Sequence, residues 1–147
     1  MGRATHPKLG RETCERIAKV LERYAKVKIG KGRNGEPDMI LEMGSQAFGV
    51  EAKRCKGIAF KRSVNNIELS KIQWEYLVGW CKENKARPIV AVEIVVVGGE
   101  NIYFILDTNV VDEGYKRCEG KTWFGFSMWQ VIRSGDKPDD YFWRAPV

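Results

Sequence analysis

The feature that most constrains the fold is a pair of short β-like segments on either side of a turn. Residues 39–43 form a mostly apolar run, and residues 47–53 return after Gly44-Ser45. Two such runs joined through a glycine-containing turn predict a β-hairpin. Alternate side chains of a strand point to the same face, so we expect Glu51 and Lys53 to share one face of the returning strand.

This hairpin brings two acidic side chains together. Asp38 stands immediately before the first strand and Glu51 lies late on the second, so their carboxylates can converge. Two carboxylates at hydrogen-bond distance repel each other unless a cation lies between them, and Mg²⁺ suits oxygen ligands of this kind. The ammonium group of Lys53 can orient an attacking water or stabilise negative charge on a phosphate. The three residues therefore predict metal-dependent hydrolysis of a phosphodiester.

The bulk composition favours a nucleic-acid partner. The chain has 147 residues, which is the length of one domain, and a net charge of +6. A positive balance of this kind favours a polyanionic partner, with nucleic acid ahead of a membrane surface. We recognise no signal peptide and no membrane-spanning run, so we expect a cytoplasmic, nucleoid-associated protein with no membrane partner.

The cysteines and the histidine exclude other chemistries. The four cysteines contain no Cys-x-x-Cys pair, which argues against a zinc site and favours reduced, mostly buried thiols. The single histidine, His6, lies close to the start of the chain. A Ser-His-Asp or Cys-His arrangement would therefore lack its general base.

The rest of the chain predicts an α/β protein with a central mixed sheet flanked by helices. Apolar residues at helical spacing predict helices, and β-branched runs predict strands. We expect helices over 13–25, 69–83 and 127–132 and further strands over 26–29, 89–97 and 102–106. Asn66 or Ser70 could cap the second helix. Glu93 interrupts an otherwise apolar strand and is either a further site acid or the partner of a lysine.

Basic residues cluster beside the hairpin. The segment 30–35 has the spacing Gly-x-Gly-x-x-Gly, but Pro37 and a β-like run follow it instead of the helix that a nucleotide site requires. We interpret it as a basic loop. The basic residues expected to contact DNA phosphates are Lys31, Arg33, Arg54, Lys56, Lys61 and Arg62.

On these residues the chain resembles the PD-(D/E)xK nuclease superfamily, and within it the archaeal Holliday-junction resolvases. The resemblance is carried by Pro37-Asp38-Met39-Ile40-Leu41, Glu51-Ala52-Lys53, Gly10 with Glu15-Arg16, Leu69-Ser70-Lys71-Ile72-Gln73, and Ile89-Val90-Ala91-Val92. It covers about residues 10–106 and leaves 107–147 as an aromatic-rich C-terminal extension of a single nuclease domain. Core packing, a dimer interface and base stacking all remain open for that extension.

The resemblance implies a restriction-endonuclease-like core and a role for each motif residue. Asp38 and Glu51 would bind Mg²⁺, for which Mn²⁺ could substitute, and Lys53 would assist the attacking water. The backbone carbonyl of Ala52 would add a metal ligand.

Two helical residues are further candidates by the same resemblance. Glu15 would supply an acidic residue from the first helix, with a solvated glutamate as the alternative. Gln73 would be an accessory residue near the site, with a surface amide as the alternative.

The function implied is a Mg²⁺-dependent endodeoxyribonuclease that cuts branched DNA as a homodimer, in the manner of a junction resolvase. Two alternatives remain open. One is a sequence-specific homing, restriction-type or repair endonuclease of the same fold, and the other is a non-catalytic nucleic-acid-binding module.

Overall fold

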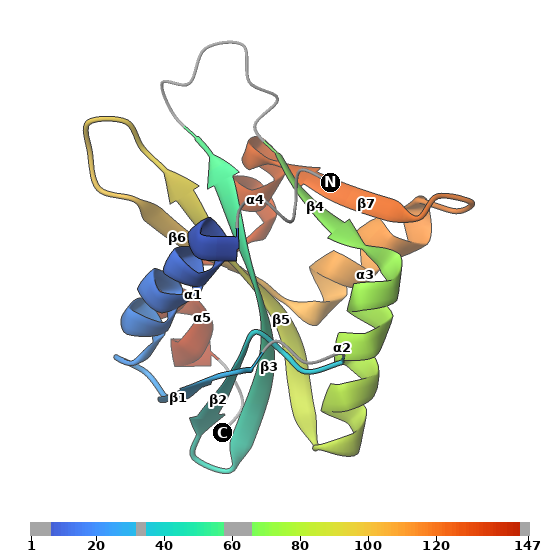
Figure 1. Cartoon of the computed structure of the whole chain (residues 1–147), viewed down its shortest axis with the longest axis horizontal. Helices are drawn as coiled ribbons and strands as arrows, with labels where there is room; N and C mark the ends of the chain where they lie inside the picture. The colour runs from blue at the N-terminus through green and yellow to red at the C-terminus, as the bar shows by residue number, and fades with distance from the viewer. Residues whose placement is uncertain (1–6, 32–34, 58–65, 145–147) are drawn as a thin grey trace.

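A mixed five-stranded sheet, in the order β1-β2-β3-β5-β6, forms the centre of the protein (Figure 1). The computed structural model describes residues 7–31, 35–57 and 66–144. The strands of this sheet are β1 (Lys26–Ile29), β2 (Met39–Met43), β3 (Gln46–Lys56), β5 (Ala86–Val95) and β6 (Ile102–Leu106). Strands β3 and β5 run parallel, and the other neighbours are antiparallel. A separate two-stranded sheet joins β4 (Asn66–Ser70) to β7 (Trp123–Ser127).

Helices cover both faces of the main sheet, as the sequence predicts for an α/β protein. They are α1 (Pro7–Leu21), α2 (Lys71–Glu83), α3 (Thr108–Arg117), α4 (Met128–Ser134) and α5 (Pro138–Arg144). Helices α1 and α5 pack on one face, while α2, α3 and the β4–β7 ribbon pack on the other (Figure 1). None of the described helices is long and apolar enough to cross a bilayer.

The predicted hairpin is confirmed, although its returning strand spans Gln46–Lys56 rather than 47–53. Met39 pairs with Val50, and Met43 pairs with Gln46 at the turn. Val50 and Phe48 are fully buried in the core beneath α1, and Ala52 packs against the same cluster. Val50 and Ala52 therefore occupy one face of β3, which leaves the intervening residues to the opposite face.

On that opposite face, α2 lies directly against β3 at Gly49. A Cβ atom at Gly49 would lie 2.6 Å from Cys81 Sγ and 3.1 Å from Leu77 Cδ1, both on α2. Real side chains do not approach so closely, so only glycine allows α2 to sit at this distance. Gly49 is two residues before Glu51, and the close approach therefore fixes the helix beside the candidate site.

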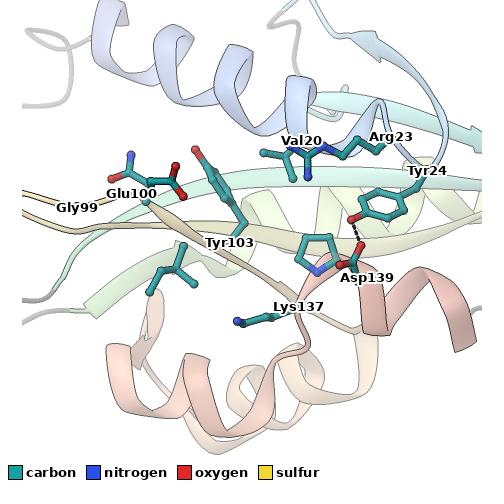
Figure 2. A pocket seen from close by; sticks show the side chains of 11 residues that line it. Val20, Arg23, Tyr24, Gly99, Glu100, Tyr103, Lys137 and Asp139 are labelled. Carbon is teal, nitrogen blue, oxygen red and sulfur yellow. Dashed lines mark hydrogen bonds between the residues drawn. The ribbon is translucent and has the colours of Figure 1, made fainter.

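The turn that follows α1 contacts α5. The hydroxyl of Tyr24 donates a hydrogen bond to Asp139 (Figure 2). The ring of Tyr24 also stacks on Phe142, with 5.3 Å between the ring centroids. These contacts connect segments far apart in the sequence.

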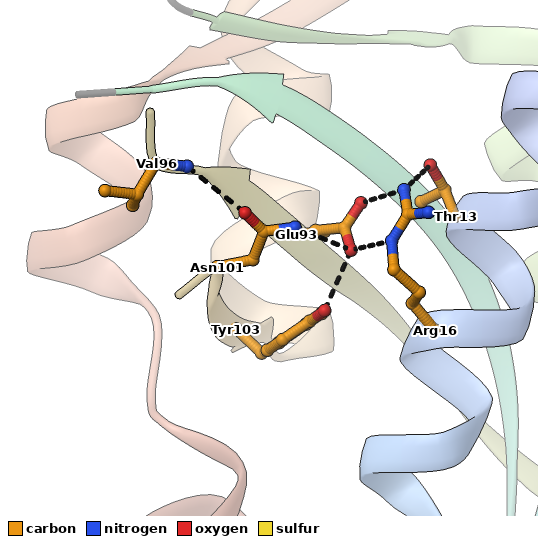
Figure 3. Close-up of polar contacts among 6 residues, drawn as sticks. All are labelled: Thr13, Arg16, Glu93, Val96, Asn101 and Tyr103. Atoms are coloured by element: carbon orange, nitrogen blue, oxygen red, sulfur yellow. Dashed lines mark hydrogen bonds and ion pairs between the residues drawn. The ribbon is translucent and has the colours of Figure 1, made fainter. Parts of the chain in front are cut away.

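An ion pair between an exposed arginine and a buried glutamate holds the middle of α1 to the sheet. Glu93 on β5 has no exposed surface and accepts hydrogen bonds from Arg16 Nε at 2.6 Å and Arg16 Nη2 at 2.9 Å (Figure 3). Tyr103 on β6 donates a third bond at 2.8 Å. Burial opposes ionisation of Glu93, but these donors outweigh it and lower its pKa. The alternative that Glu93 is the partner of a lysine is wrong, because its cationic partner is Arg16 of the first helix.

The element boundaries differ from the predicted ones where short-range patterns mislead. The first helix spans Pro7–Leu21 rather than 13–25, and the second begins at Lys71 rather than 69. Ser70 is the last residue of β4, and its side chain caps α2 by accepting from the N–H of Gln73 at 3.4 Å. The expectation that Ser70 caps this helix is confirmed.

Several elements have no counterpart in the sequence-based prediction. They are β4, α3, β7 and α5. Among the described residues, the two ribbon strands pair with each other alone, as in Ile67 with Phe126, and such a distant partner leaves no local signal. Helices α3 and α5 are short and carry glycine or several aromatic residues, which weakens a helical pattern.

We expect Gly49→Ala to destabilise the fold by about 1–3 kcal/mol, because the added methyl group collides with α2. Gly79→Ala, within α2, is the matched control, since nothing lies within 4 Å of the place that its added Cβ atom would take. That change should stabilise the protein by about 0.5–1 kcal/mol. Urea denaturation of both variants measures this, and equal effects would contradict the close packing of α2 on β3.

We expect Arg16→Met to destabilise the fold by about 3–5 kcal/mol, because Glu93 would stay buried without its charge partner. The double variant Arg16→Met/Glu93→Met should recover most of the loss. Arg11→Met, at an exposed position of the same helix, is the control and should change stability little. Thermal unfolding compares the four proteins.

Candidate active site

Asp38 and Glu51 lie side by side where β2 begins. Strand β2 starts at Met39, which pairs with Val50, so Asp38 stands next to Glu51 in the same register. The Oδ2 atom of Asp38 accepts a hydrogen bond from the backbone N–H of Ala52 at 2.8 Å. The carboxylate is therefore held against β3, and its second oxygen remains for a cation.

This hydrogen bond compensates for the end of the strand pairing. The β2–β3 ladder stops at Met39 and Val50, so the N–H of Ala52 on that edge has no further strand partner in β2. The Asp38 side chain takes the place of the missing strand. In a strand, the N–H and C=O of one residue point to the same edge, so the carbonyl of Ala52 also faces the side of Asp38.

Glu51 and Lys53 occupy the same face of β3, as predicted from their spacing. Lys53 Nζ lies 3.7 Å from Glu51 Oε2. The Lys53 side chain is 23% exposed and the Glu51 side chain 19%. An ion pair with so little solvent around it is screened less than a surface pair.

Burial raises the pKa of both carboxyl groups, so a nearby cation would favour their ionised forms. Burial, with the negative charge of Asp38 as the second cause, raises the pKa of Glu51 to about 7, although Lys53 opposes this. Burial also raises the pKa of Asp38, while the Ala52 N–H and Lys53 oppose it. A divalent cation would relieve the repulsion between two such groups.

The donor atoms fit a hard cation such as Mg²⁺. They are two carboxylates and a backbone carbonyl, and Mg²⁺ prefers oxygen ligands and keeps several waters. Within the described ranges, no group of three Asp, Glu, His or Cys side chains could hold a metal ion by itself. An ion here would therefore depend on water and substrate oxygens for the rest of its coordination.

The first helix brings a thiol toward this pair. Burial is the main cause that raises the pKa of Cys14 to about 12, and the charges of Asp38 and Glu51 raise it further. Cys14 was not among the predicted site residues, although its position on the apolar stripe of the helix was the available signal. Glu15 is exposed, and its role in the site stays a prediction.

The remaining candidates are placed as follows. Gln73 is exposed in the first turn of α2, and its accessory role stays a prediction. Lys31, Arg54 and Lys56 are exposed, as phosphate contacts must be. The N–H of Gly30, beside Lys31, donates to the backbone carbonyl of Asp38 at 2.8 Å. Arg33, Lys61 and Arg62 lie outside the described residues.

Comparison with known proteins supports the fold. The sequence matches no protein-family model and no curated protein. The structure matches that of Archaeoglobus fulgidus Hjc, a Holliday junction resolvase from an archaeal hyperthermophile, with a TM-score of 0.69. The chain has the fold of an archaeal Holliday junction resolvase.

The expected restriction-endonuclease-like α/β fold is thereby confirmed. The match covers 94% of this chain and 98% of the resolvase chain, at 14% sequence identity. Coverage of this extent reaches beyond residues 10–106, to which the sequence resemblance was confined, and includes most of the C-terminal third.

The raised pKa of Glu51 gives a pH dependence of stability. A carboxyl group that binds its proton more tightly in the folded state stabilises the fold while it is protonated. The contribution of Glu51 is therefore complete below about pH 4.5 and is lost as the pH rises through about 7. We expect the melting temperature of the metal-free protein, relative to Glu51→Gln, to fall across this interval.

The glutamine variant is a suitable reference because it imitates the protonated carboxyl group at every pH. Calorimetry of both proteins in EDTA between about pH 4 and 8 measures the difference. A constant difference between the two melting temperatures would show that Glu51 titrates as an exposed glutamate does.

Proposed function

We propose that this protein is a divalent-metal-dependent DNA endonuclease that cuts branched DNA, like a Holliday-junction resolvase. The observation that carries the proposal is the convergence of Asp38, Glu51 and Lys53 on a resolvase fold. Acid, acid and lysine in this arrangement suit hydrolysis of a phosphodiester.

Each residue has a chemical role in this proposal. Asp38, Glu51 and the carbonyl of Ala52 would hold Mg²⁺, which supplies Lewis-acid activation of water and phosphate when bound. Ala52 N–H fixes the orientation of the Asp38 carboxylate. Lys53, held near Glu51 at 3.7 Å, donates a hydrogen bond to the attacking water or to a phosphate oxygen as negative charge develops.

The surface around the site suits a DNA backbone. Lys26 and Lys28 are exposed on β1, and Arg54 and Lys56 are exposed on β3. Together with a net charge of +6, these side chains favour contacts with phosphates rather than with base edges. Binding of this kind selects the shape of DNA and not its sequence.

The proposal extends to the assembly and the chain as a whole. A homodimer would present two sites to the two strands of a branched substrate. A DNA-cleaving protein of this kind would act at the nucleoid in the cytoplasm. Residues 1–147 would form one nuclease domain, which is supported by the packing of Val111 and Phe124 in the same cluster as Leu77.

Cleavage of a four-way junction tests the proposal. We expect wild-type protein to cut a labelled junction with Mg²⁺ and not with EDTA. Asp38→Asn, Glu51→Gln and Lys53→Met should each reduce the rate at least about 100-fold, while junction binding in a gel-shift assay is retained.

Two controls separate the alternatives. Lys116→Met, at an exposed position on α3, should leave cleavage unchanged. A linear duplex with the same arm sequences should be cut slowly or not at all. Cleavage of one linear sequence with no action on junctions would indicate a sequence-specific enzyme, and binding without any cleavage would indicate a non-catalytic module.

A further inference from the structure

A pocket of about 470 Å³ lies between the turn after α1, the end of β2 and helix α5. Its volume falls within the range of about 300–1,000 Å³ that is usual for small-molecule sites. Three aromatic rings, one thioether and two carboxylates line it, from Tyr24, Met43, Asp139, Asp140, Phe142 and Trp143. No lysine, arginine or histidine is among these described lining residues.

Packing already fixes one wall of the pocket. The rings of Tyr24 and Phe142 are stacked, with 5.3 Å between their centroids. Phe142 in turn packs edge-on against the buried ring of Phe48, at 5.7 Å. The hydroxyl of Tyr24 donates a hydrogen bond to Asp139 (Figure 2). A ligand would therefore meet this wall without having to order it first.

The other aromatic side chain of the pocket, Trp143, is open to solvent. It is 89% exposed, although it lines the pocket. A molecule that covered this ring would remove a large apolar surface from water. The face of a tryptophan ring also attracts a cation more strongly than the other aromatic rings do.

The negative charge in the pocket is not neutralised by a neighbouring cation. Asp139 accepts the hydroxyl of Tyr24, and Asp140 is exposed. Arg144, one turn after Asp140 on α5, is paired with Asp136 at 2.5 Å. Within the described ranges, the carboxylate of Asp140 forms no ion pair.

The neighbouring cleft differs from this pocket in its charge. That cleft shares Tyr24 and Asp139 with the pocket, and Arg23 and Lys137 line it together with Glu100 (Figure 2). Charges of both signs are thus present there. In the pocket beside Trp143 both charged side chains are acidic, so its charge favours a cation.

The lining indicates which kind of cation can bind. A metal ion such as Mg²⁺ needs about six oxygen ligands, and no group of three Asp, Glu, His or Cys side chains in the described ranges could hold one. Aromatic faces suit an organic ammonium ion instead. A basic protein would be repelled by the net charge of +6, whereas a small ion responds mainly to charges within about 8 Å at physiological ionic strength.

We infer that this pocket binds a small alkylammonium ion, with its nitrogen beside Asp140 and its alkyl chain against the rings of Tyr24 and Trp143. Met43 and Asp38 lie at opposite ends of β2. The pocket is thus distinct from the Asp38 site, and the inference does not depend on the proposed nuclease activity.

Fluorine NMR of the intact protein labelled with 5-fluorotryptophan tests the inference. The chain has five tryptophans, and Trp143 is the one among the described residues that lines the pocket. Trp143→Phe assigns its signal. The probe is n-butylammonium chloride, and sodium chloride holds the ionic strength constant, so that sodium ions compete for any purely electrostatic attraction. We expect the Trp143 signal to shift with a Kd of about 1–10 mM.

The matched probe is n-butanol, which has the same alkyl chain but no charge. We expect it to bind at least about tenfold more weakly, because it gains neither the carboxylate nor the cation–π attraction. Absence of a shift with n-butylammonium, or equal affinity for the two probes, would overturn the inference.

Variants identify the residues that hold the ion. Asp140→Asn and Trp143→Ala should each weaken binding of n-butylammonium at least about threefold in ligand-detected NMR. The matched controls are Glu119→Gln, at an exposed acid, and Trp129→Ala, at a ring that is 61% exposed on α4. Neither control should change the affinity. Wild-type affinity in both pocket variants would contradict the assignment.

A peptide probe distinguishes a small ion from a lysine of a partner protein. Acetyl-Gly-Gly-Lys-Gly-Gly-amide carries the same alkylammonium group on a peptide chain. We expect it to bind no more tightly than n-butylammonium, because the described pocket has room for the side chain alone. Tighter binding of the peptide would point to a protein partner and would overturn the small ion as the occupant.

Discussion

The hydrogen bond from Ala52 to Asp38 is the contact on which the candidate site depends. It exists because β2 is shorter than β3, so the longer strand extends past its partner and leaves an N–H without a ladder bond. A side-chain carboxylate satisfies that N–H and is fixed by it. The Asp38 carboxylate therefore satisfies the unpaired N–H at this strand end, and it is also a group that can bind a cation.

Packing from both faces of the sheet keeps that strand end in place. On one side, Gly49 allows α2 to approach β3 within contact distance. On the other side, α1 is held by the Arg16–Glu93 pair and, through the turn that follows it, by the contacts of Tyr24 with α5. Helix α1 also carries Cys14, whose thiol is close enough to Asp38 and Glu51 for their charges to raise its pKa.

The sequence predicted the structural features that depend on neighbouring residues, and it missed the contacts between residues that lie far apart in the chain. The hairpin and the shared face of Glu51 and Lys53 follow from alternation over a few residues, and both were confirmed. The partner of Glu93 is Arg16, 77 residues away, and no local pattern reveals such a pair. The β4–β7 ribbon was missed for the same reason, since each strand is defined by the other.

Cys14 adds no negative charge to the Asp38–Glu51 pair. Burial and the charges of the two carboxylates raise the pKa of this thiol to about 12, so it stays neutral, whereas Glu15 would add a third negative charge if it faced the pair. Asp38 and Glu51 together with Lys53 then carry a net charge of −1 when both carboxyl groups are ionised. A divalent ion of the kind proposed above would, with two carboxylate ligands, keep more of its positive charge for the phosphate oxygens of a substrate. Its affinity for the protein alone would be correspondingly lower, so binding of the proposed ion and binding of DNA would strengthen each other.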